Sequence, residues 1–164
     1  MEDRRLEEAI RHLRPASGDR LWHGGASVLG ALRGLSPEAA AWRPAPERHS
    51  IWEQALHVAY TDYGVRRRIT GEARGGFPRS PADWPAAPAE PTSEAWKADR
   101  ALVRESHERL AEAMEAFDPS RLDERAGGAA DTTYADLFTG IVLHETYHAG
   151  QIQLLKRLAV ARGL

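Results

Sequence analysis

Two histidines near the C-terminal end of the chain, His144 and His148, are spaced to bind one metal ion. They occur in LHETYHAGQIQLLKRL, and residues four apart lie one turn apart on the same face of a helix. Each unpaired nitrogen of a buried imidazole costs about 1–3 kcal/mol, and a metal would remove that cost. A third ligand is then expected elsewhere in the core. The alternative, a chance pair without a metal, stays open at this point. The spacing of three and four predicts a core-facing series along one helix: Tyr134, Leu137, Ile141, His144, His148, Gln151, Leu155 and Leu158.

A third imidazole, His57, lies on a helix whose ends are clearly marked. Ser50 and Glu53 form an S-x-x-E capping box, which predicts a helix over residues 51–70 that stops at Gly71. At 1.5 Å rise per residue, His57 comes level with the C-terminal pair if the two helices are antiparallel. The series predicted to face the core comprises Trp52, Ala55, Leu56, Ala59 and Tyr63, with His57 at its edge.

The rest of the chain also has helical periodicity. Five prolines in residues 71–91 exclude a regular element there, so this segment is expected to be a long loop pinned by Phe77 and Trp84. A connection of this length can cross a bundle and join two parallel helices. No strand pattern appears, and the chain is predicted to be an all-α four-helix bundle in a single domain, residues 1–164. The other expected helices cover residues 2–14, 20–35, 36–41, 92–117 (capped by Thr92) and the segment opened by Thr133 and Asp136.

The composition narrows the function classes. The 22 basic and 24 acidic residues nearly cancel, which argues against nucleic acid or an anionic membrane as a partner. Cysteine is absent, so His, Asp and Glu are the available metal ligands and the protein has no thiol nucleophile. No run of 18 apolar residues occurs, and a cytoplasmic protein is expected. A homodimer is possible, since bundles of this size often bury a helix face in a C2 dimer.

The other histidines receive weaker expectations. His12 and His107 fall on strongly charged helices, so both are expected to be exposed and receive no role. His23 either lines the mouth of a cavity or is solvated in a loop. His49 either helps to close the site or packs beside it.

Three residues close to the histidine pair could support it. Gln151 lies one turn beyond His148 and could hydrogen-bond a metal-bound water or a neighbouring helix. Glu145 and Tyr147 flank the pair, and a supporting role is the most that their position on the helix indicates.

The motifs together resemble the DinB superfamily. The resemblance rests on WRPAPERHSIWEQALHVAY, on ADWP and TSEAW in and after the Pro-rich loop, and on one His followed later by H-x-x-x-H-x-x-Q. It extends over nearly the whole chain from about Leu32. It implies an up-down-down-up bundle in which His57, His144 and His148 bind a divalent metal. Characterised members of the family include S-transferases and isomerases that use low-molecular-weight thiols such as bacillithiol or mycothiol.

The leading interpretation is a metal-dependent enzyme in which three neutral imidazoles leave coordination positions open. Zn is the leading metal, with Ni, Mn and Fe as alternatives, since imidazole binds several ions. The expected reaction is thiol-dependent S-transfer to a small electrophile, with the thiol supplied from outside. The alternatives are a metal-dependent hydrolase and a non-catalytic metal-binding stress protein, which a fourth ligand from Asp or Glu would favour.

Overall fold

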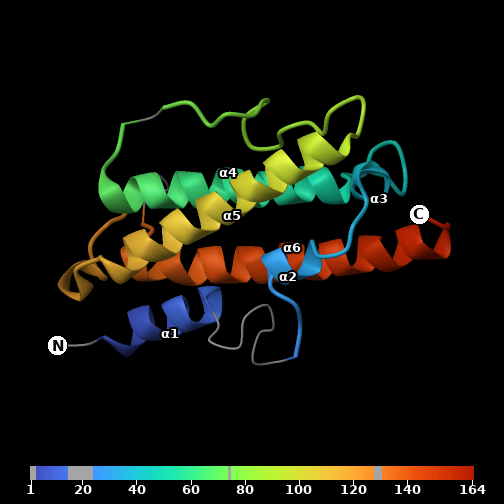
Figure 1. Ribbon diagram of the computed structural model, residues 1–164. Coiled ribbons are helices and arrows are strands. Elements are labelled where there is room, and N and C mark those ends of the chain that lie inside the picture. The colour runs from blue at the N-terminus through green and yellow to red at the C-terminus, as the bar shows by residue number, and fades with distance from the viewer. Residues whose placement is uncertain (1–2, 15–23, 74, 128–130) are drawn as a thin grey trace.

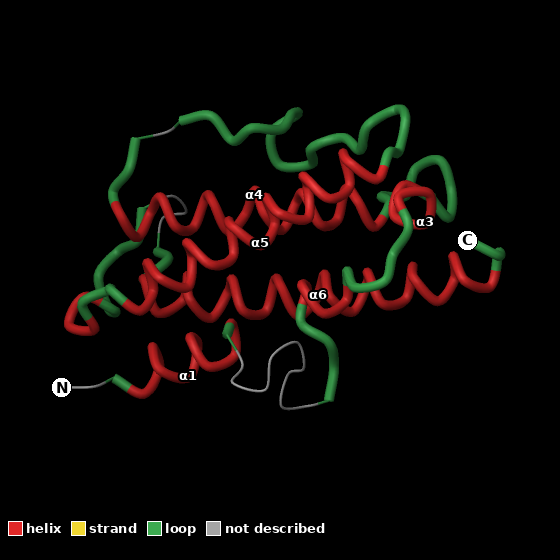
Figure 2. Tube along the Cα trace, viewed as in Figure 1, coloured by secondary structure: helices red, strands yellow, loops and turns green. Residues whose placement is uncertain are grey.

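The computed structural model describes residues 3–14, 24–73, 75–127 and 131–164. These residues form helices joined by loops and turns, with no strand among them (Figures 1 and 2). An isolated bridge pairs Arg125 with Thr133. The all-α class predicted from the sequence is therefore confirmed for the described part of the chain. The helical elements are α1 (Arg4–Leu13), α2 (Val28–Ala31), α3 (Pro37–Ala41), α4 (Ile51–Thr70), α5 (Ser93–Glu115), the 3-10 turn η1 (Pro119–Arg121) and α6 (Tyr134–Ala161), of which α1, α4, α5 and α6 are long.

The ends of α4 are where the capping residues predict them. The Ser50 hydroxyl oxygen accepts a hydrogen bond from the backbone nitrogen of Glu53 (3.2 Å). The Glu53 carboxylate in turn accepts one from the backbone nitrogen of Ser50 (2.9 Å). These bonds satisfy two donors at the helix start. Gly71 ends the helix in the left-handed conformation, with φ of 72°.

The start of α6 and the cap of α5 also agree with the sequence prediction. Thr133 and Asp136 make a reciprocal pair at α6, in which each backbone nitrogen donates to the other side chain (3.0 and 3.1 Å). Thr92 caps α5 by accepting from the backbone nitrogen of Ala95 (3.1 Å). In each case a short polar side chain replaces the hydrogen-bond acceptor that the first turn lacks.

The helix predicted over residues 20–35 is wrong in its described part. Helical structure there is confined to Val28–Ala31, while residues 20–23 lie outside the described residues. The Ser27 hydroxyl oxygen accepts from the backbone nitrogen of Gly30 (3.1 Å) and so starts the helix late. Gly24 has φ of 81°, a left-handed conformation that a helix cannot contain.

The long loop and the helices that it connects have a clear course in Figure 1. α4 and α5 run in the same direction from the end of the molecule near α3, and the chain between them leads back along the bundle. α6 runs in the opposite direction to α4 and packs against it. Phe77 pins the loop, with its ring 5.5 Å from that of Tyr60 and 5.6 Å from that of Tyr63. Tyr63 is therefore half-buried against the loop and not in the predicted core series.

The apolar core is divided into two clusters along the bundle. On α4, the first cluster ends at Ala59 and the second begins at Val65, and α5 and α6 show the same break. Leu158 was predicted to face the core but is 42% exposed, because it lies at the edge of a surface pocket. Buried polar side chains lie in or next to the break between the clusters: His57, Asp62, Ser106, His107, Glu145 and His148.

Candidate metal centre

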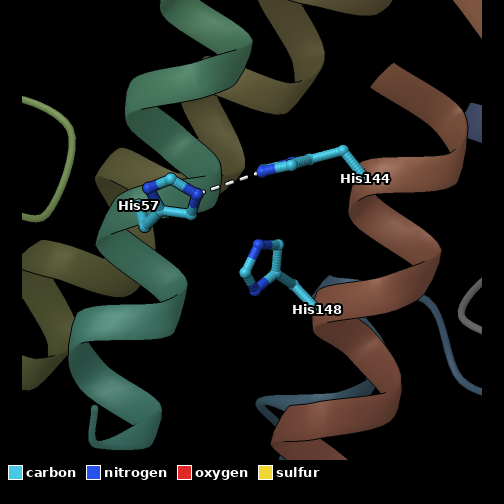
Figure 3. A group of neighbouring side chains, drawn as sticks. All are labelled: His57, His144 and His148. Carbon is cyan, nitrogen blue, oxygen red and sulfur yellow. Dashed lines mark hydrogen bonds between the residues drawn. The ribbon is translucent and has the colours of Figure 1, made fainter. Parts of the chain in front are cut away.

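The structure brings the three predicted histidines together. His57 on α4 and His144 and His148 on α6 point toward one another (Figure 3), and their potential ligand atoms all lie within 4.8 Å of one another. The Nε2 atoms of His57 and His144 are 3.0 Å apart. We call these residues the three-histidine group. Antiparallel α4 and α6 therefore place a residue early in one helix level with residues in the middle of the other.

His57 is oriented by the long loop. Its Nδ1 donates a hydrogen bond to the backbone carbonyl oxygen of Asp83 (2.6 Å), so that Nε2 carries the free lone pair. Asp83 has φ of 70°, a left-handed conformation that aspartate adopts more readily than most residues. A backbone carbonyl that accepts a hydrogen bond from one ring nitrogen commonly fixes an imidazole whose other nitrogen binds a metal.

His148 is oriented by a residue that the sequence analysis missed. Its Nδ1 donates to the side-chain oxygen of Gln54, which lies on α4 one turn before His57. Burial, then the neighbouring His144 and His57, lower the pKa of His148 to about 4. Its imidazole is therefore neutral at neutral pH, the form that binds metals. The spacing of three residues between Gln54 and His57 was the signal available in the sequence.

Trp84 and His49 cover the three-histidine group from the loop side. The Trp84 ring stacks on His57 with 3.9 Å between centroids and 3° between planes. The His49 ring also stacks on Trp84, with 3.7 Å between centroids and 9° between planes. His49 thus packs beside the site, and Trp84 pins the loop as predicted.

A surface pocket of about 680 Å³ opens beside His148. Its lining includes Trp84, Gln151 and the apolar side chains of Leu154 and Leu155. The side-chain oxygen of Gln151 is buried and accepts no hydrogen bond. Gln151 therefore lines the pocket beside His148, and its hydrogen bond to a metal-bound water or to a neighbouring helix stays a prediction.

The donor set fits a divalent metal ion. Nitrogen ligands at about 2.0–2.1 Å in a tetrahedral site are separated by roughly 3.3 Å, close to the distance between the two Nε2 atoms. Burial and the neighbouring His57 lower the pKa of His144, which favours the neutral, metal-binding form. Its Nδ1 is buried without a hydrogen-bond partner. Metal binding by these residues stays a prediction.

His107 is buried, and the expectation that it is exposed is wrong. It is 8% exposed and lies on the inner face of α5, where Val103, His107, Leu110 and Met114 follow at intervals of three and four. That periodicity was the signal in the sequence. Nδ1 of His107 lies 2.9 Å from a carboxylate oxygen of Glu145.

Two acidic residues complete a second group around His107. Asp62 on α4 and Glu145 on α6 are 0% and 6% exposed, and their ligand atoms and that of His107 lie within 4.8 Å of one another. We call these residues the mixed group. Glu145 therefore pairs with His107, and its predicted supporting role for the neighbouring histidine pair stays a prediction.

Two other candidates lie beside the groups without belonging to them. The Tyr147 ring packs against that of His148, with 5.1 Å between centroids, and His12 lines a small cavity together with Glu145. His12 is half-buried on α1, so the expectation that it is exposed is wrong, while Tyr147 is 62% exposed. His23 falls outside the described residues.

Comparisons with known proteins identify the family. Comparisons with curated proteins and with solved structures found no match. No helix in the described part of the chain is long and apolar enough to cross a membrane. The family model of the DinB superfamily matches residues 20–152, which include the three-histidine group and the mixed group. The chain therefore belongs to the DinB superfamily.

Proposed function

We propose that this protein is a divalent-metal-dependent enzyme that transfers a small electrophilic group to the sulfur of a low-molecular-weight thiol. The observation that carries the proposal is the three-histidine group, whose imidazoles converge beside a pocket. Within the described residues, no Asp or Glu joins this group as a fourth ligand. Three protein ligands with an open position are typical of catalytic metal sites. Zn is the leading metal, and Ni, Mn and Fe are alternatives.

A bound divalent metal would supply electrostatic stabilisation of the thiolate form of the cosubstrate near neutral pH. The chain itself contains no cysteine, so the sulfur must come from a second molecule. In the reaction, a carbon–sulfur bond forms, the leaving group departs with its electron pair, and the thiol proton passes to solvent. Atoms and charge then balance without an oxidant or reductant.

The chain's own residues would orient the reactants. The Asp83 carbonyl and the Gln54 side chain hold two of the imidazoles in one orientation. The side chain of Gln151 lines the pocket beside His148, where it would contact a bound substrate. The apolar wall formed by Leu154 and Leu155 suits an electrophile with a hydrocarbon body.

The test is a conjugation assay on protein of known metal content. Purified protein is loaded with Zn²⁺, Ni²⁺, Mn²⁺ or Fe²⁺ and incubated with an aryl halide in the presence of bacillithiol, mycothiol or cysteine. We expect product that requires both metal and thiol and that is lost in His148→Ala. Turnover of ester or amide substrates without thiol would instead indicate a hydrolase. A metal-loaded protein that supports neither reaction would indicate a non-catalytic metal-binding protein.

Two further features belong to this proposal. The parallel course of α4 and α5 in Figure 1 supports the up-down-down-up arrangement that family resemblance implies. A homodimer is the proposed oligomer, because α6 carries exposed Leu143, Tyr147 and Leu154 at intervals of four and seven. Light scattering should then give the mass of a dimer for the native chain and of a monomer for Leu143→Glu.

A further inference from the structure

The mixed group has no part in the proposed function. α4, α5 and α6 contribute one side chain each, Asp62, His107 and Glu145, which are 0%, 8% and 6% exposed. Their ligand atoms lie within 4.8 Å of one another. The bundle interior therefore contains a compact set of one imidazole and two carboxylates, gathered from three helices.

Asp62 lacks the partners that a buried carboxylate needs. Both of its oxygens are buried, and neither accepts a hydrogen bond. In the described part of the chain, no Lys or Arg pairs with Asp62, and the ion-pair partner of Glu145 is His107. An ionised carboxylate is strongly destabilised without hydration or a counter-charge. Two carboxylates facing each other at this depth therefore call for a positive charge between them.

We propose that the mixed group binds a divalent first-row transition-metal ion, with one carboxylate oxygen from Asp62, one from Glu145 and a ring nitrogen of His107 as ligands. The charge of the ion would balance the two carboxylates while His107 stays neutral. Mixed oxygen and imidazole ligands suit Mn²⁺, Fe²⁺ and Zn²⁺. The proposal does not depend on the three-histidine group or on the S-transfer reaction.

A proton is the competing way to neutralise the group. Burial, followed by the charge of Glu145, raises the pKa of Asp62 well above its ordinary value. This shift favours a proton on Asp62 in the metal-free protein, and a bound metal would displace that proton.

The position of the mixed group predicts a structural effect of the metal. The group lies in the break between the two apolar clusters, where the buried apolar residues of α4, α5 and α6 are interrupted. An ion bound there would link α4, α5 and α6 in the middle of the bundle. Because it binds only the folded chain, it should raise the midpoint of thermal unfolding in proportion to its occupancy.

The experiment uses Mn²⁺ and the full chain with the three-histidine group disabled by His57→Ala and His148→Ala. Binding is measured by the loss of the free Mn²⁺ electron paramagnetic resonance signal, both on the native protein and after refolding with Mn²⁺ present. We expect one equivalent of Mn²⁺ and a higher unfolding midpoint. Adding Asp62→Asn to this background should abolish both, while Ser106→Ala, a buried neighbour outside the group, should leave both unchanged.

Glu145→Gln replaces Asp62→Asn if the latter fails to fold. The proposal would be overturned if the variant with His57→Ala and His148→Ala bound no Mn²⁺ after refolding. Equal Mn²⁺ binding with and without Asp62→Asn would overturn it as well. In native protein, two equivalents would show that both groups bind. One equivalent that is lost in Asp62→Asn but kept in His148→Ala would sustain this site and refute the three-histidine site, so the two proposals fail separately.

Discussion

The three-histidine group and the mixed group lie on the same helices but are held in different ways. The imidazoles of the first group are uncharged when they bind metal. Two of them are oriented by hydrogen bonds from Nδ1 to the Asp83 carbonyl and to the Gln54 side chain. The mixed group holds two acidic side chains, and neither buried oxygen of Asp62 accepts a hydrogen bond. The first group borders a pocket of about 680 Å³, whereas the second is enclosed among buried residues.

This difference separates two uses of a buried polar cluster. Pre-oriented neutral ligands at the wall of a pocket can bind a metal that a small molecule also reaches. An enclosed cluster with excess negative charge can bind a cation but offers a substrate no access. We therefore expect the three-histidine group to govern activity and the mixed group to govern stability.

The largest expected effect comes from removing a ligand of the three-histidine group. His144→Ala should lower activity by more than about 100-fold, since even residues that only orient metal ligands are worth 10–100-fold. Elemental analysis should show the loss of one metal equivalent, with the helical circular dichroism signal retained because the apolar clusters are untouched. His12→Ala is the matched control and should keep full metal content. Full occupancy in His144→Ala would remove that residue from the site.

A smaller loss is expected when a ligand is kept but its orientation is freed. Gln54→Ala removes the acceptor for Nδ1 of His148 and should weaken metal binding by about 10–100-fold. Titration against a chromogenic chelator measures this change. Gln153→Ala, a half-buried glutamine on α6 outside the site, should have no effect on affinity. Equal affinities for the two variants would mean that Gln54 does not position His148.

Acidification should release the metal from the three-histidine group. Imidazole binds metal only when neutral, and the ordinary imidazole pKa is about 6.5. Because the pKa values of His144 and His148 are lowered, protons compete with the metal only at a more acidic pH than for free imidazole. Metal content and activity should fall together on acidification, with more than one proton taken up per metal released. Retained activity after complete metal loss would contradict a metal-dependent reaction.

Neutralising the mixed group should stabilise the metal-free protein. In excess chelator, Asp62→Asn should raise the free energy of unfolding at pH 8 by about 1–3 kcal/mol, because it removes a poorly solvated acid from the interior. Urea denaturation measures the difference. His148→Gln should give no such gain, since it replaces a neutral side chain. A destabilised Asp62→Asn would show that the native carboxyl group makes a favourable interaction in the metal-free chain.

The smallest effect is expected at Asp83. Its backbone carbonyl, 2.6 Å from Nδ1 of His57, is closer than its carboxylate, 3.4 Å from the same atom. Asp83→Gly keeps the carbonyl and tolerates φ of 70°, so metal affinity should change by less than about twofold. Asp83→Val should weaken metal binding more than Asp83→Gly does, because a β-branched residue is strained in that conformation. A large loss in Asp83→Gly would assign the orienting role to the carboxylate.

Local sequence was sufficient for the starts of α4 and α6 and for one part of the candidate site. The capping pairs at Ser50 and Thr133 depend on residues three positions apart, so they can be recognised from the sequence alone. The spacing of four between His144 and His148 is likewise a property of a single helix. Helix rise then predicted that His57 would come level with them, given antiparallel helices.

Only the tertiary structure decided the contacts between helices and loops. Asp62, His107 and Glu145 share no spacing, and the charge of α5 suggested an exposed His107 although its helical phase pointed inward. Gln54 acquires its role because α6 brings His148 to it. Side-chain partners on separate helices depend on the rotation and offset of the packed helices, which no local pattern specifies.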